Sequence, residues 1–203
     1  PSMAFASKKA RDSKLERALI VTFALADLLV DGGERVGIPG LMNPSASRNI
    51  VDRMAQAVLH DQTTRMSLPP AFVPSPLSEI VVLSDFWSPI DEVRKTLNGL
   101  SSTGAHGTLV QVVDPAEETF PYSGRIEFVE PEGAGQITAG RAETWASDYI
   151  ARVARHREEI RAETQRRGWL FPIHNTDRSA AELLLYLHGG MTASRGGQIG
   201  RRA

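Results

Sequence analysis

The chain contains no cysteine in its 203 residues. This absence excludes disulfide frameworks, thiol nucleophiles, zinc knuckles and iron–sulfur clusters. The chain also lacks an excess of charge of one sign, because 23 lysine and arginine residues stand against 24 aspartate and glutamate residues. Domains that bind nucleic acids normally carry a basic excess, so this balance argues against that class.

Long apolar runs and targeting signals are missing too. The longest apolar stretch, residues 18–30, contains Thr22 and Asp27 and is shorter than the roughly 20 residues that cross a bilayer. No basic-then-apolar signal peptide follows Pro1-Ser2-Met3. We therefore predict a cytoplasmic location and no membrane insertion for this chain.

The signatures of common nucleotide-binding and catalytic sites are absent. The chain has no Gly-x-x-x-x-Gly-Lys phosphate loop, no Gly-x-Gly-x-x-Gly, no Gly-x-Ser-x-Gly and no His-Glu-x-x-His. Its five histidines are scattered, and none is paired at the spacing of metal ligands. Function must therefore be inferred from less direct signals.

Segments with helical periodicity alternate with short apolar runs along the chain. The periodicity predicts helices over residues 14–30, 47–60, 89–100, 141–168 and 179–188. The apolar runs predict strands over residues 35–38, 79–85, 107–113 and 169–173, with a further extended segment at 125–129. Such alternation indicates an α/β fold, a doubly wound and mostly parallel sheet of Rossmann-like type, over residues 1–188. Residues 189–203, rich in Gly, Ser and Arg, are expected to form a disordered tail.

Carboxylates follow three of the predicted strands. Asp85 and Asp114 come directly after the two clearest strands, and Asp177 follows the last one. Parallel strands would gather these side chains at one edge of the sheet, where sites form in such folds. Oxygen ligands of this kind suit Mg²⁺, but aspartate also caps helices, and the spacing alone leaves both interpretations open.

Several short motifs resemble a known family. The chain is similar to the von Willebrand factor A-like proteins of the domain of unknown function fifty-eight family over about residues 1 to 188. The motifs that carry the resemblance are Ser2-Met3-Ala4-Phe5, Lys14-Leu15-Glu16-Arg17-Ala18, Gly33-Glu34-Arg35-Val36-Gly37, Ser84-Asp85-Phe86, Asp114-Pro115-Ala116-Glu117, Pro121-Tyr122-Ser123-Gly124-Arg125 with Phe128, and Thr176-Asp177-Arg178.

The resemblance implies a metal-ion-dependent adhesion site. The first motif of such a site is Asp-x-Ser-x-Ser, and Ser2 matches its final serine. Asp85 matches a later aspartate that holds the metal, usually through water. Ser45 and Ser47 lie in the region of the family's threonine ligand, which has no clear match in this chain. The resemblance therefore implies Mg²⁺ or Mn²⁺ at Ser2 and Asp85, with Ser45 and Ser47 as further candidates, if the upstream part of the motif is present.

The resemblance also implies that the chain is truncated at its N-terminus. The aspartate and the first serine of the metal motif would precede Pro1, together with the first strand, which is central in this fold. A gap of about 10 Å, two strand spacings, would then separate the strand at Val36 from the strand at Val81. A chain without that strand is expected to be less stable than one that contains it.

Three functions follow as hypotheses. The first is a non-enzymatic protein-interaction module that acts with a MoxR-type AAA+ ATPase on a client protein, because relatives are typically encoded beside such ATPases. Asp114 and Glu117 would then form a partner-binding rim, although Asp-Pro is also a common turn opener. The second is a metal-dependent hydrolase, and the third is a structural domain with a degenerate, empty site.

Overall fold

A three-stranded parallel sheet forms the centre of the molecule. The computed structural model describes residues 2–61, 68–129 and 135–199. The sheet contains β3 (Glu79–Ser84), β4 (His106–Val113) and β7 (Ile173–Asn175) in the order β3-β4-β7, and both pairings are parallel. The α/β fold class and its parallel sheet are therefore confirmed.

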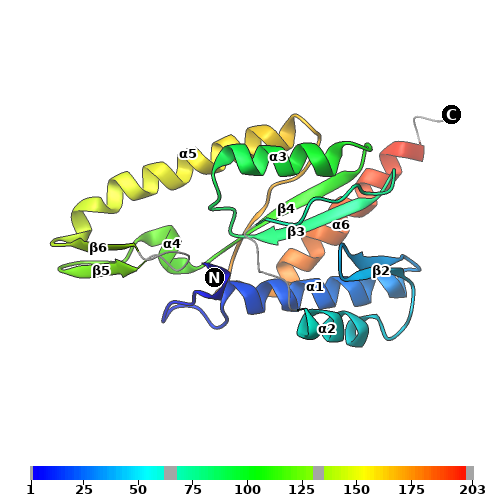
Figure 1. The fold of residues 1–203 in the computed structure, drawn as a ribbon, viewed down its shortest axis with the longest axis horizontal. Coiled ribbons are helices and arrows are strands. Elements are labelled where there is room, and N and C mark those ends of the chain that lie inside the picture. Colours follow the sequence, from blue (N-terminus) through cyan, green and yellow to red (C-terminus); the bar gives the residue numbers. More distant parts are fainter. Residues whose placement is uncertain (1, 62–67, 130–134, 200–203) are drawn as a thin grey trace.

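Helices cover both faces of this sheet (Figure 1). One face packs against α1 (Lys14–Asp31) and α6 (Ala180–Ile199), and the other packs against α3 (Ile90–Ser101) and α5 (Ala146–Gln165). Successive side chains of a strand point to opposite faces. Val81 and Leu83 therefore join the cluster with α1 and α6, whereas Ile80 and Val82 join the cluster with α3. Burial on both faces explains the unbroken apolar run of β3.

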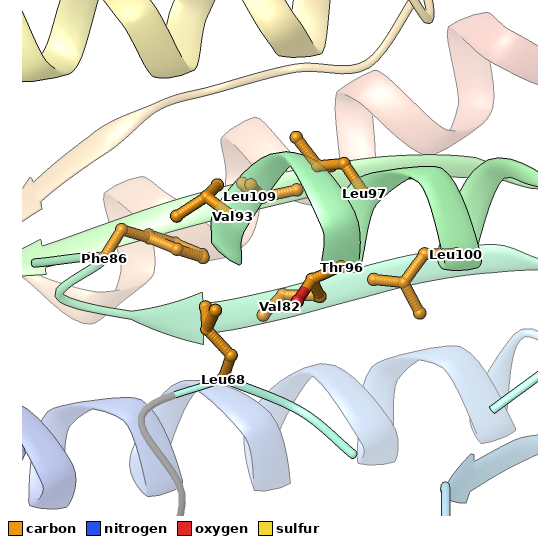
Figure 2. Close-up of a pocket in the computed structure, with 8 residues that line it drawn as sticks. All are labelled: Leu68, Val82, Phe86, Val93, Thr96, Leu97, Leu100 and Leu109. Atoms are coloured by element: carbon orange, nitrogen blue, oxygen red, sulfur yellow. The ribbon is translucent and has the colours of Figure 1, made fainter. Parts of the chain in front are cut away.

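Apolar side chains fill the layer between α3 and the sheet (Figure 2). Val93, Leu97 and Leu100 of α3 lie over Val82 and Leu109, and each of these three is at most 2 % exposed. The space left among these side chains is about 10 Å³. That volume is close to the minimum that one water molecule needs, so we interpret it as a packing gap.

A small antiparallel hairpin lies apart from the parallel sheet. It contains β1 (Val36–Ile38) and β2 (Met42–Ser45), and α2 (Ile50–His60) follows it. The hairpin and α2 pack against the second half of α1 through a cluster around Ile50 and Met54 (Figure 1). Among the described strands, neither β1 nor β2 pairs with β3.

A second hairpin extends the molecule at the opposite end. β4 is followed by α4 (Pro115–Thr119), β5 (Ile126–Val129) and β6 (Gln136–Ala139), and the 3₁₀ helix η2 (Ala142–Trp145) leads into α5. Figure 1 shows β5, β6 and the first turn of α5 together, beyond the carboxyl end of β4. We call α4, β5, β6 and η2 the aromatic end of the molecule.

The structure differs from the predicted elements mainly in short segments. Helix α4 was not predicted, and it forms because Asp114 and Glu117 make a capping box. The strand predicted over residues 169–173 is β7, which starts only at Ile173, while Leu170 makes a single bridge to Thr108. Strands β2 and β6 were not predicted, since both are short and neither has a continuous apolar run.

The last helix was predicted to end at residue 188, and this end was wrong; the disordered tail itself stays a prediction. Helix α6 continues to Ile199, because Leu183, Leu187 and Met191 recur at helical spacing and pack against α1 and β4. Residues 200–203 lie outside the described residues.

A 3₁₀ helix, η1 (Ser2–Ala4), precedes α1. No described helix is both long enough and apolar enough to cross a membrane.

Candidate functional site

Asp85 lies at the carboxyl end of the parallel sheet. β3 ends at Ser84, and Phe86 then adopts the left-handed backbone conformation with φ 54°, which turns the chain away from the sheet. Gln111 of β4 holds this turn, because its Nε2 donates a hydrogen bond of 2.8 Å to the Asp85 carbonyl oxygen. Asp85 is only 2 % exposed, so its carboxylate needs a partner inside the protein.

That partner is the ammonium group of Lys14. Lys14 Nζ lies 3.0 Å from Asp85 Oδ2 and 2.7 Å from Glu117 Oε1, and Lys14 itself is 1 % exposed. Lys14 is the first residue of α1, which begins with a capping box of Ser13 and Glu16. A positive charge is unfavourable at a helix N-terminus and costly to bury. The two carboxylates are therefore what stabilises the ammonium group at this position.

Asp114 and Glu117 connect this ion pair to α4. Asp114 accepts hydrogen bonds from the backbone N–H groups of Ala116 at 2.8 Å and Ser7 at 2.7 Å. Glu117 accepts from the Asp114 N–H at 2.9 Å and from Trp87 Nε1 at 3.2 Å, in addition to Lys14. We call Lys14, Asp85, Asp114 and Glu117 the Lys14 network; it joins the ends of β3 and β4 to the start of α1.

The two residues predicted to form a partner-binding rim, Asp114 and Glu117, differ in exposure. Asp114 is completely buried, and both of its carboxylate oxygens accept backbone hydrogen bonds. The Glu117 side chain is 16 % exposed. Of the pair, only Glu117 reaches a surface that a partner could contact, and the rim stays a prediction.

The serines predicted as metal ligands do not join Asp85 among the described interactions. Ser45 Oγ accepts a hydrogen bond from Arg53 Nη1 at 2.9 Å, and Ser47 bonds Asn49. Both lie in or just after β2, on the hairpin that packs along the second half of α1 (Figure 1). Ser2 lies in η1, which contacts α1. The Asp85 carboxylate bonds only Lys14 and the Trp87 backbone among the described residues.

The predicted oxygen ligands, Ser2, Ser45, Ser47 and Asp85, do not fit a divalent cation in their observed arrangement. In residues 2–61, 68–129 and 135–199, no group of three His, Asp or Glu side chains could hold a metal ion. The Lys14 ammonium group already supplies a positive charge to Asp85 and Glu117. Mg²⁺ or Mn²⁺ at Asp85 stays a prediction, and such an ion would have to replace the Lys14 contact.

His156 contacts the two residues that follow Asp85 and is a packed side chain. His156 Nε2 donates a 2.7 Å hydrogen bond to the Phe86 carbonyl oxygen, and its ring stacks on Trp87 with a centroid distance of 5.9 Å. The middle of α5 is thereby attached to the turn after β3. Both contacts are structural, and neither presents the imidazole to a ligand.

His174 follows a predicted strand, and it is the one histidine that lies near a carboxylate at a strand end in the sequence. It is 5 % exposed, and its Nε2 has no hydrogen-bond partner among the described residues. Burial, and after it the charge of Arg17, lower the pKa of His174, while Glu182 and Asp177 act in the opposite direction. The folded protein therefore holds this imidazole in its neutral form.

We expect His174 to make the fold less stable in acid. Because the pKa is lower in the folded state than the usual value of about 6.5, the unfolded chain binds the proton more readily. This contribution to the free energy of unfolding is present in full above pH 6.5 and is lost as the pH falls through that value toward the folded-state pKa. Urea unfolding between pH 5 and 8 should show a smaller pH dependence for His174→Gln than for the natural chain; equal slopes would contradict the assignment.

An open pocket lies at the aromatic end of the molecule. Its volume is about 300 Å³, within the range of ligand pockets. Five aromatic rings line it, from the segment that follows α4, from β5, from η2 and from α5: Phe120, Tyr122, Phe128, Trp145 and Tyr149. Glu117 of the Lys14 network also lines the pocket. The pocket and the buried ion pairs are therefore two parts of one region.

Contacts between the rings hold the pocket in shape. The Phe120 ring lies 4.8 Å from Tyr149, 5.2 Å from Tyr122 and 5.8 Å from Phe128, measured between ring centroids. Phe128 in turn stacks on Trp145 at 6.0 Å. Phe120 is the C-cap residue of α4 and adopts the left-handed conformation with φ 43°, which directs the chain from α4 toward β5.

Sequence reasoning missed both Lys14 and the aromatic pocket. Lys14 was placed on a helix, but no local pattern shows that a lysine will meet carboxylates 71 and 103 residues away. The pattern Asp114-x-x-Glu117 is a capping-box signature and could have revealed α4. The pocket has no such signature, since its rings are spread over residues 120–149.

One comparison with known proteins gave a match. A family model described as "Protein of unknown function DUF58" matches residues 1–159. The match includes all parts of the Lys14 network and the aromatic pocket, but it ends before Thr176-Asp177-Arg178. No curated protein and no solved structure matches the chain.

Proposed function

Because the chain belongs to the family of proteins of unknown function DUF58, we propose that it is a non-enzymatic protein-interaction module that contacts its partner through the aromatic end. The observation that carries this proposal is a set of large apolar side chains exposed there. Ile137 is 61 % exposed and Trp145 is 40 % exposed, and both side chains line the pocket. Exposed apolar groups that gather in one place are typical of protein-binding surfaces.

The proposed partner is a MoxR-type AAA+ ATPase, which would act together with this chain on a client protein. The family resemblance supports this partner, and no contact in the described structure bears on it. The same resemblance suggests Mg²⁺ or Mn²⁺ at Asp85. The Lys14 network favours a contact that needs no such ion, since a lysine ammonium group already neutralises part of the charge at Asp85 and Glu117.

The Lys14 network also supports a second candidate, a structural domain that binds neither a cation nor a partner at this site. Its four side chains connect α1, β3, β4 and α4, which is a stabilising role in itself. The hydrolase hypothesis has no comparable support, because His174 is buried and His156 bonds a backbone carbonyl group. A binding measurement separates the interaction module from the structural domain.

We expect Ile137→Ser to weaken binding of a MoxR-type AAA+ ATPase at least tenfold. Burying an isoleucine side chain contributes about 1.5–3 kcal/mol, and serine loses most of it. The affinity is measured by biolayer interferometry with the purified ATPase, without nucleotide, in Mg²⁺ and in EDTA. Leu59→Ser is the matched control, because Leu59 is 82 % exposed on α2, away from the aromatic end.

Equal affinities of Ile137→Ser and Leu59→Ser for the ATPase would contradict the proposed surface. If the natural chain does not bind the ATPase, the result favours the structural domain. Equal binding in Mg²⁺ and EDTA is the expected result. A large loss of affinity in EDTA would instead assign a divalent cation to the contact.

A further inference from the structure

The aromatic pocket has the composition of a cation-binding cage. Five of the eight residues that line it are phenylalanine, tyrosine or tryptophan. The faces of such rings carry partial negative charge and attract an ammonium or guanidinium group within about 6 Å of the ring centroid. Glu117, which caps α4 and pairs with Lys14, is also part of the lining and adds a carboxylate to the rings.

The charges beneath the pocket also favour a cation. The charges that act on Tyr122 and Tyr149 of the pocket include those of Asp114, Glu117, Glu118 and Arg157. Lys14 pairs with Glu117 and Asp85, which makes four carboxylates and two cations in this region. Arg157 is occupied by Glu118 and Gln111, and Lys14 is occupied by Asp85 and Glu117. The carboxylates outnumber the cations, so the pocket floor carries negative charge.

The two tyrosines of the pocket respond to this charge. Burial, and after it the charge of Glu117, raise the pKa of Tyr149 to about 12, although Arg157 acts in the opposite direction. Burial, and after it the charges of Asp114 and Glu117, raise the pKa of Tyr122. Burial is the larger cause for both tyrosines, and the nearby carboxylates add to it.

Glu117 retains capacity for one more hydrogen bond. Its Oε1 accepts from Lys14 and Trp87, whereas Oε2 accepts only the Asp114 N–H among the described residues. A carboxylate oxygen has two acceptor sites, so a donor that enters the pocket could bond Oε2. The Lys14 network holds this oxygen in place before any ligand arrives.

We propose that the aromatic pocket binds a basic side chain, lysine or arginine, that a partner protein inserts between the rings toward Glu117. This inference rests on the proposed interaction function and names the chemical group that the module recognises. A protein is the source because the exposed Ile137 and Trp145 at the mouth offer an apolar rim, which would cover the alkyl stem of such a side chain and the backbone beside it.

The test compares basic amino-acid derivatives with neutral ones of similar shape. N-acetyl-argininamide is paired with N-acetyl-citrullinamide, and N-acetyl-lysinamide with N-acetyl-norleucinamide. Each is titrated into the full ¹⁵N-labelled chain, and shifts of the amides of β5, β6 and η2 are followed by NMR. We expect the basic member of at least one pair to bind roughly tenfold more tightly, as cation–π attraction with a carboxylate predicts.

Two variants of one residue separate cation recognition from apolar packing. Trp145→Leu removes a π face but keeps apolar volume, and it should reduce the preference for the basic member. Trp145→Phe keeps a ring and should retain most of that preference. Since Trp145 is 40 % exposed, both variants should fold, which unchanged amide shifts in β3 and β4 would verify.

Equal affinity for the basic and neutral members would overturn the inference, because it would identify an apolar slot. A preference that is equally large in Trp145→Leu, or shifts that lie outside the aromatic end, would overturn it as well. If the natural chain binds the ATPase in an Ile137-dependent way but shows no preference for basic derivatives, the inference fails and the proposed function stands. A clear preference without ATPase binding would support the cation-binding pocket and contradict the proposed ATPase partner.

Discussion

Replacing Lys14 with methionine should lower the free energy of unfolding by about 3–5 kcal/mol. Methionine keeps most of the length of the side chain but removes the ammonium group, which leaves Asp85 and Glu117 without their cation in the protein interior. An unpaired buried charge costs far more than the net gain of the pair itself. Urea unfolding followed by circular dichroism at pH 7 measures the loss.

Two comparisons show whether the loss comes from unpaired charge. Lys9→Met removes an exposed lysine from the same region and should change the free energy of unfolding by less than about 0.5 kcal/mol. The triple variant Lys14→Met, Asp85→Asn, Glu117→Gln removes the charges together and should recover much of the stability. If the triple variant is less stable than Lys14→Met alone, unpaired charge is not the cause.

Gly107→Ala should destabilise the protein by about 2 kcal/mol, within the usual range for an overpacked core. Gly107 lies in β4 opposite Ile80, and the Trp169 ring rests directly on it. A Cβ atom at this position would come within 2.4 Å of the indole ring. The ring cannot easily move away, because Trp169 is 3 % exposed and its Nε1 donates to the Ala105 carbonyl oxygen.

Gly99→Ala is the matched control and should have the opposite sign. Gly99 lies within α3, and a Cβ atom there would meet nothing within 4 Å. Alanine in a helix is more stable than glycine by about 0.5–1 kcal/mol. The double variant Gly107→Ala, Trp169→Leu should lose less than the sum of the single variants, since leucine removes the clash. Additive losses would contradict direct contact between the two residues.

The sequence predicted the central fold correctly because local patterns determine it. An unbroken apolar run such as that of β3 has few interpretations, and helical periodicity over residues 14–30 predicted α1 closely. The short strands β2 and β6 lack such patterns. They form because a partner strand lies beside them, as in the pairing of Phe128 with Ile137, and single-sequence reasoning does not supply that partner.

The candidate site was predicted only in part for a related reason. Asp85 and Asp114 were correctly placed at the ends of neighbouring strands, and they do share one network. What decides the chemistry there is Lys14, which arrives from the start of α1. A lysine at the first position of a helix normally extends into solvent. Its burial depends on the three-dimensional path of the chain and leaves no signal in the local sequence.

The separate packing of the aromatic end has a consequence for how the protein opens. Phe120, Ala139 and Ala142 form a cluster of their own with the rings around them, distinct from the two clusters that cover the sheet. A unit with its own small core can unfold locally at a lower free energy than the whole protein. Amide hydrogen exchange in β5 and β6 would then outpace exchange in β4, and a partner seated in the pocket would slow it. Binding at this pocket would thus make the aromatic end more rigid and leave the parallel sheet unchanged.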